Sequence, residues 1–372
     1  MRADPRSTFG LDVDTGSYSV VRTLLEQDLL RRRGSVRVEE WVNSFDYHDE
    51  APPGQGLGIT IEQGPVADED RPSAHLTLVV DTSGSMDIRE RLGLVKSSLA
   101  LLADTLDDDD TLFIVTYGDE AEPLLEPTAV SETDTILDAI DELRPGGSTN
   151  LEAGLRTGYA QATDAFRPDA ISTVILASDG VANVGVTGPG RLAGQIAEAG
   201  DDGIHLVTMG FGMGNYNDDL MEQLADQGNG FYAYVDTFAE AERLFVEDLT
   251  STLTVVAADA RVQVGFDEQQ VESYRLLGYE NRAIDDDDFT DMEVDAGEVG
   301  AGHTVTALYE AELAEGIDED EPIGEVDLRW ISVDDDAQDQ ATAGIVLADA
   351  GADTEALALA SVVAEAAQRA ER

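Results

Sequence analysis

The chain has 372 residues, 42% of them hydrophobic, which fits two or three folded domains. Its 78 acidic and 22 basic residues give a formal net charge of −56, and such a field repels nucleic acid and anionic membranes, so we expect neither as a partner. The absence of cysteine excludes disulfides and thiol catalysis.

The acidic composition includes a single lysine, Lys96, which is typical of a protein from a salt-rich environment. At about 1 M salt the Debye length falls to about 3 Å, so repulsion between the acidic groups is screened. The sequence shows neither an apolar run long enough to cross a membrane nor a leader peptide. We therefore expect no membrane span and a cytoplasmic location, with an extracellular or surface-anchored form after leader removal as the alternative.

The first 72 residues contain a helical pattern at 17–33, the stretch VRVEEWVNSF at 36–45, a Pro/Gly-rich linker at 51–58 and one predicted strand, ITIEQ at 59–63. A single strand needs a partner, because an unpaired edge is costly to expose. We expect the strand at 59–63 to pair with strands from the C-terminal end of the chain.

The motif LDVDTGSYS at 11–19 resembles the Asp-Thr-Gly loop of aspartic proteases, whose two aspartates share one proton. The second candidate, Asp81-Thr82-Ser83-Gly84, has its glycine one residue too late, and the helical periodicity disagrees with an all-β protease. A haloacid-dehalogenase-type phosphatase is disfavoured too, because Gly16 stands where that family has threonine. We expect this turn to cap the following helix through Asp14, Thr15 or Ser17.

Residues 73–250 alternate between strand and helix patterns, which predicts an α/β domain with a doubly wound, mostly parallel sheet. The predicted strands cover 75–80, 111–117, 172–178, 204–212 and 231–235. The predicted helices cover 91–106, 132–143, 151–166, 189–199, 219–228 and 239–250.

The C-terminal part has strand patterns at 253–266, 273–281, 303–313 and 325–333, an acidic Ala/Gly-rich stretch at 334–352 that we expect to be a loop, and a helix at 354–372. We expect these strands and the N-terminal flank to form a smaller antiparallel β unit into which the α/β domain is inserted. The predicted parts are an N-terminal segment (1–72), an α/β domain (73–250), a C-terminal β extension (251–353) and a closing helix (354–372).

Oxygen-bearing side chains gather at loops that follow the predicted strands. Asp81, Ser83 and Ser85 form a DxSxS motif after the strand at 75–80, and oxygen ligands of this kind suit Mg²⁺. Thr149 lies in the Gly-rich loop RPGGSTN, and Asp179 follows the strand at 172–178. Carboxyl ends of parallel strands meet at one edge of a sheet, so these five residues predict a metal site there. Two structural alternatives stay open: Thr149 as a helix cap and Asp179-Gly180 as a turn.

This pattern resembles the von Willebrand factor type A domain and its metal-ion-dependent adhesion site, with a Rossmann-like fold. The resemblance implies that Ser83, Ser85 and Thr149 contact the metal directly and that Asp81 and Asp179 act through water. The stretches STFGLDVDTGSYSVVRTLL and GYENRAIDDDDFTDMEVDAGEVGAGHTVTALYE resemble a bacterial subfamily with its own N-terminal segment and C-terminal extension. Because the stretch after Val333 is acidic and irregular, we expect that extension to be shortened.

The resemblance implies a non-enzymatic, adhesion- or scaffold-type protein-binding module. In that family a carboxylate from a partner protein completes the coordination of the cation, which we expect to be Mg²⁺, with Mn²⁺ or Ca²⁺ as alternatives. The other hypotheses are a domain whose metal is only stabilising and a metal-assisted hydrolase. The hydrolase is disfavoured because the loops contain no histidine or lysine to act as a base. Around the site, Asn150 and Asn183 are candidates for supporting roles, and Met213 and Tyr216 for the rim.

Overall fold

A computed structural model describes most of the chain. The described residues are 5–11, 14–26, 36–45, 72–168, 170–180, 196–197, 199–200, 203–212, 218–247, 253, 255–280, 282–291, 294, 296–300, 304–314, 322–333, 337–346 and 354–371.

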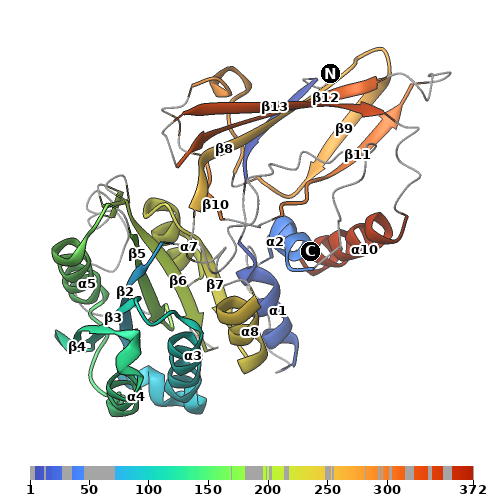
Figure 1. Cartoon of the computed structure of the whole chain (residues 1–372). Coiled ribbons are helices and arrows are strands. Elements are labelled where there is room, and N and C mark those ends of the chain that lie inside the picture. The colour runs from blue at the N-terminus through green and yellow to red at the C-terminus, as the bar shows by residue number, and fades with distance from the viewer. Residues whose placement is uncertain are drawn as a thin grey trace. The chain divides into compact units, whose positions relative to one another are not determined.

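The chain divides into two compact units, and each combines segments that lie far apart in the sequence. The α/β unit comprises Ser19–Arg31 and Val66–Thr254, and the β unit comprises Met1–Tyr18, Arg32–Pro65 and Val255–Arg372. Figure 1 shows the helix-covered sheet of the first unit and the long antiparallel strands of the second. The predicted fold class is confirmed: a mostly parallel α/β sheet is inserted between flanks that build an antiparallel sheet.

The α/β unit has a six-stranded sheet of order β4-β3-β2-β5-β6-β7, in which all neighbours are parallel except β4, which is antiparallel to β3. The edge strand β4 was not predicted, because its sequence AEPLLEPTA contains two prolines; prolines are tolerated at an edge, where an amide need not pair. The strands are β2 (Ala74–Asp81), β3 (Thr111–Tyr117), β4 (Ala121–Ala129), β5 (Ile171–Ser178), β6 (Ile204–Phe211) and β7 (Tyr232–Val235).

Both faces of this sheet are buried. Along β2, Leu76, Leu78 and Val80 join one hydrophobic core, whereas Val79 joins the core on the opposite face. Helices α3 (Arg91–Thr105), α4 (Thr133–Glu142) and α8 (Phe238–Glu242) contribute to the first core, and α5 (Leu151–Ala165) and α7 (Asp218–Gln227) to the second. This double burial explains why the strand is a continuous apolar run, and it leaves the strand ends as the accessible place for chemistry.

The β unit contains a five-stranded antiparallel sheet and a two-stranded ribbon. In the sheet the order is β1-β8-β12-β13, with β10 also paired to β8, and the ribbon pairs β11 with β9. Its strands are β1 (Arg6–Gly10), β8 (Val255–Phe266), β9 (Val271–Leu277), β10 (Val299–Gly300), β11 (Leu308–Leu313), β12 (Pro322–Ser332) and β13 (Gln338–Val346).

Two details of this unit differ from the expectation. The N-terminal strand that pairs with β8 is β1, which was not predicted, and the predicted strand at 59–63 lies outside the described residues. The prediction of a loop at 334–352 was wrong, because β13 pairs with β12 over nearly its whole length. Its acidic, Ala/Gly-rich sequence has weak strand propensity, and pairing at the sheet edge overrides that propensity.

Three helices carry described residues of the β unit: the start of α1 (Gly16–Glu26), α2 (Val38–Asn43) and α10 (Thr354–Glu371), the last of which confirms the closing helix. Helices α2 and α10 pack against each other. None of the described helices combines the length and the apolar character needed to cross a membrane.

Candidate metal centre

The DxSxS motif begins on the last residue of β2 and continues into a 3₁₀ segment, Gly84–Glu90. Asp81 and Ser83 are buried, whereas Ser85 is partly exposed. The hydroxyl oxygens of Ser83 and Ser85 lie 3.0 Å apart, which is the separation expected of two groups that can face one small cation.

The carboxylate of Asp81 is held by neutral donors. Its Oδ1 accepts a hydrogen bond from the Ser83 amide at 2.8 Å, and its Oδ2 accepts one from the Ser178 hydroxyl at 2.9 Å and another from the Tyr117 hydroxyl at 3.3 Å. The pKa of Asp81 is raised to about 6: burial is the main cause, the nearby charge of Asp179 contributes to the rise, and the hydrogen bonds from Ser83 and Ser178 oppose it. The described donors to the ionised carboxylate are therefore all neutral, and a bound cation would supply the positive charge that stabilises it.

Asp179 directly follows β5, which is the parallel neighbour of β2. It is fully buried, and its Oδ2 accepts a hydrogen bond from Nη1 of Arg91 at 2.7 Å. The two predicted aspartates thus lie at adjacent strand ends, close enough for their charges to interact.

The loop that carries Thr149 is joined to the DxSxS loop through the backbone. The Gly146 amide donates to the Thr82 carbonyl at 2.7 Å, and the Gly84 amide donates to the Gly147 carbonyl at 3.1 Å. Thr149 itself is buried. The cap of α5 is Asn150, whose side chain accepts from the Ala153 amide, so the expectation that Thr149 caps this helix is not what the structure shows.

Four side chains around these loops were not singled out by the sequence. Asp119 accepts from the Ser148 amide at 2.9 Å and from the Ser148 hydroxyl at 2.5 Å, which ties the Gly-rich loop to the turn after β3. These hydrogen bonds lower the pKa of Asp119. No local motif marks this contact, because the two residues lie 29 positions apart. The four side chains are Arg91, Tyr117, Asp119 and Ser178.

The donor set fits a small divalent cation. Two carboxylates and three hydroxyls on three connected loops are hard oxygen ligands, and the loops belong to one sheet edge. The structure thus connects the loops of all five predicted residues: Asp81, Ser83, Ser85, Thr149 and Asp179. Asn183, Met213 and Tyr216 lie outside the described residues.

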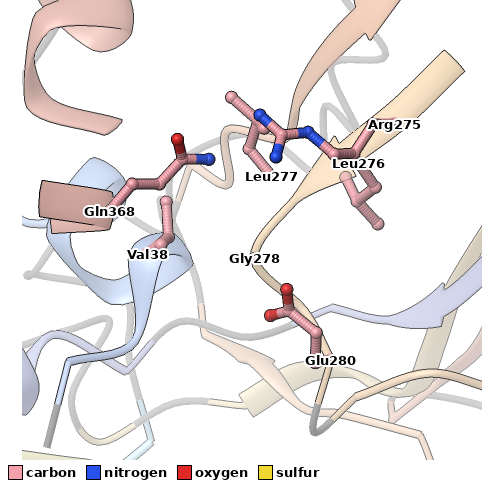
Figure 2. Close-up of a pocket in the computed structure, with 7 residues that line it drawn as sticks. All are labelled: Val38, Arg275, Leu276, Leu277, Gly278, Glu280 and Gln368. Atoms are coloured by element: carbon pink, nitrogen blue, oxygen red, sulfur yellow. The ribbon is translucent and has the colours of Figure 1, made fainter. Parts of the chain in front are cut away.

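A small pocket of about 110 Å³ lies in the β unit and contains none of these residues (Figure 2). It is below the usual size of a ligand site. Arg275 at its rim is paired across the ribbon with Glu310 at 2.8 Å, and Gly278 has a positive φ of 88° where a Cβ would lie 2.7 Å from the Glu39 amide. The pocket is therefore best explained as a packing gap. Its lining residues are Val38, Arg275, Leu276, Leu277, Gly278, Glu280 and Gln368.

Family models match the chain in three consecutive parts. Residues 1–71 match the model described as "von Willebrand factor", residues 75–250 match "von Willebrand factor type A domain", and residues 251–371 match "Uncharacterized protein YfbK, C-terminal". The last match includes the stretch after Val333, and whether the extension is shortened stays a prediction.

Individual proteins are also similar to this chain. The chain is 38% identical over 336 residues to the Escherichia coli (strain K12) protein YfbK, an alignment that covers 83% of this chain and 58% of that protein. The solved structure of a "von Willebrand factor type A from Catenulispora acidiphila" is 18% identical, with a TM-score of 0.47 and coverage of 74% of this chain and 66% of that one.

A further solved structure is the mussel byssus proximal thread matrix protein 1, described "with zinc occupied MIDAS motif". It is 19% identical, with a TM-score of 0.41 and coverage of 48% of each chain. The chain spans only part of the length of the relatives it matches. The chain belongs to the von Willebrand factor type A domain proteins of the YfbK kind, with the N-terminal segment and C-terminal extension of that group.

Proposed function

We propose that this chain is a non-enzymatic protein-binding module that presents a divalent cation, Mg²⁺ before Mn²⁺ or Ca²⁺, to a carboxylate of a partner protein. The bound cation supplies a Lewis-acidic position that a carboxylate oxygen fills. The residues proposed to hold it are Asp81, Ser83, Ser85, Thr149 and Asp179.

One observation carries the proposal: two buried carboxylates at adjacent strand ends lie beside a pair of hydroxyls on the same loop. Packing alone gives no reason to place such groups together, because each ionised carboxylate is costly to bury. A divalent cation offsets that cost, and a coordination position that these ligands leave open can accept an acidic group from outside.

The composition of the loops disfavours an enzyme. Residues 81–85, 146–150 and 178–180 contain neither histidine nor lysine, so no usual general base is placed among the ligands. Binding without a chemical step is consistent with the family, whose type A domains are interaction domains.

Thermal unfolding with and without Mg²⁺ tests the metal site. Mg²⁺ at about 100 times its dissociation constant should stabilise the chain by about 2.7 kcal/mol, and Asp81→Ala combined with Ser83→Ala should remove that gain. The matched control is Asp109→Ala with Ser97→Ala, which removes an exposed acid and an exposed hydroxyl. An equal Mg²⁺-induced shift of the melting temperature in wild type, site variant and control would contradict the proposal.

A second experiment separates a binding module from a domain with a merely stabilising metal. The full chain is used to capture partners at high salt, with and without chelator. Loss of a specific partner on chelation, and in the Ser83→Ala variant, supports the bridging role. Capture that is unchanged while Mg²⁺ still raises the melting temperature assigns the metal a structural role only.

A further inference from the structure

A buried arginine contacts two residues of the proposed metal centre. Arg91 is the first residue of α3, and its side chain is 5% exposed. Its Nη1 contacts Asp179 Oδ2 at 2.7 Å and the Ser85 carbonyl oxygen at 3.4 Å. A guanidinium is costly to bury unless it is paired, and here its partner is an aspartate that is also predicted to bind the metal. The same carboxylate would therefore interact with both the arginine and the cation.

The fold is shaped to admit this side chain. Gly212, directly after β6, has a φ of 89°, and a Cβ built there would lie 2.1 Å from Nε of Arg91 and 2.3 Å from its Cδ. Because Gly212 has no Cβ, the backbone at the end of β6 leaves room for the Arg91 side chain that contacts Asp179. Two separate elements, the start of α3 and the end of β6, thus place the guanidinium at the centre.

The charges near the cation depend on this arginine. Counting these three described side chains alone, Asp81, Asp179 and Arg91 carry a formal charge of −1 when the carboxylates are ionised, and the two aspartates without Arg91 carry −2. A divalent cation would neutralise the bare pair, but together with Arg91 it leaves the centre one charge positive. A buried positive centre favours an anionic ligand, and burial shields it from screening by salt.

We propose that Arg91 sets the net charge of this site. It stabilises Asp179 when no cation is bound, and it weakens cation binding. When the cation is bound, Arg91 leaves the site with one positive charge, which an anionic ligand group neutralises. This inference rests on the proposed metal-dependent function and adds a mechanism to it. Cation and acidic ligand then bind cooperatively, because each lowers the electrostatic cost of the other.

The test compares Arg91→Gln with wild type in the full chain. Without metal, the variant should melt about 10 °C lower, because the buried Asp179 carboxylate loses the ion pair with Arg91. Its affinity for Mg²⁺, taken from the dependence of melting temperature on Mg²⁺ concentration, should be at least about tenfold higher. If the variant is unfolded without metal, the Mg²⁺ concentration at which circular dichroism shows it folding gives the affinity.

Two controls bracket the result. Arg91→Lys keeps the positive charge and should bind Mg²⁺ like wild type, and Arg156→Gln removes an exposed arginine and reports the general effect of lost charge. Acetate, compared with chloride at constant pH and ionic strength, serves as the anionic probe. It should raise the Mg²⁺ affinity of wild type and leave that of Arg91→Gln unchanged.

The outcomes separate the two proposals. Weaker or equal Mg²⁺ binding by Arg91→Gln overturns the inference about Arg91 and makes it a residue that only orients Asp179. An identical acetate response in wild type and variant overturns it as well. If wild type shows no Mg²⁺ binding at all, the proposed function fails together with the inference.

Discussion

Each unit buries a pair of carboxylates, and the two pairs differ in the positive charge they are given. In the β unit, Asp14 contacts Arg282 at 3.4 Å and Glu40 is paired with Arg37. In the α/β unit, the described donors to Asp81 are an amide and hydroxyls, and Asp179 contacts the guanidinium of Arg91.

The difference separates carboxylates whose burial is explained by ion pairs from carboxylates whose burial the proposed metal site would explain. Glu40 also accepts from the Ser17 amide at 2.6 Å, so it supplies an acceptor at the start of α1 and its role is explained by folding. In the α/β unit Arg91 contacts Asp179, and the charge of Asp179 contributes to the raised pKa of Asp81. The Asp-Thr-Gly motif around Asp14 is therefore part of the β unit's own packing, and Asp12 lies outside the described residues.

The largest expected effect comes from breaking the Arg37–Glu40 ion pair of the β unit. Arg37→Met should destabilise the β unit by about 3–5 kcal/mol, because the buried Glu40 carboxylate loses the guanidinium that pairs with it. The chain's two tryptophans, Trp41 and Trp330, both lie in the β unit, so tryptophan fluorescence during urea unfolding reports this loss. Mg²⁺ should not restore it. Recovery of stability with Mg²⁺ would show that the two carboxylate pairs are not different in kind.

The next largest effect concerns Asp81 in the metal-free protein. Because the pKa of Asp81 in the folded protein is raised to about 6 from 3.8, this group costs no stability below about pH 4 and costs about 3 kcal/mol above about pH 6. Asp81→Asn removes the ionisable group. The metal-free variant should therefore be more stable than wild type at pH 8 and equal to it near pH 4.

The measurement is the difference between the two unfolding free energies across that pH range, in the presence of chelator. Subtracting the curves cancels the titration of the other acidic groups. A constant difference would mean that Asp81 is not destabilised by burial. The variant should also lose the gain from Mg²⁺ that wild type shows.

A smaller effect is expected at the rim of the centre. Asp119→Ala removes the acceptor for Ser148 and loosens the Gly-rich loop that carries Thr149. Groups that orient metal ligands typically change affinity by tenfold or more, so Mg²⁺ binding should weaken by about tenfold. Asp109→Ala, which removes an equal charge at an exposed position, is the control. Equal affinities in the two variants would assign the loop's position to its backbone bonds alone.

The smallest effect separates two neighbouring residues. Asn150→Ala removes the cap of α5 and should cost about 1 kcal/mol with or without Mg²⁺. Thr149→Ala should reduce the stability gained from Mg²⁺ and leave the metal-free stability nearly unchanged. Circular dichroism melts of both variants, with and without the cation, show which residue caps and which binds. A Mg²⁺-dependent loss in Asn150→Ala alone would reverse these assignments.

Much of the fold is written locally in the sequence. The continuous apolar run of β2 and the helical period of α3 and α5 reflect burial on fixed faces, so their elements could be predicted within a residue or two. The ligand candidates could also be predicted, because DxSxS and the residues after β5 lie at strand ends that a parallel sheet must bring together.

Other features depend on partners far away in the chain. β1 and β13 form strands because they pair with β8 and β12, respectively. Their own residues show weak preference for the strand conformation. The Arg91–Asp179 pair joins residues 88 positions apart, and the clamp from Asp119 to Ser148 spans 29. Sequence alone determined which side chains are candidates to hold a cation, whereas the tertiary structure decided which charges surround them, because electrostatic interactions depend on distance in space.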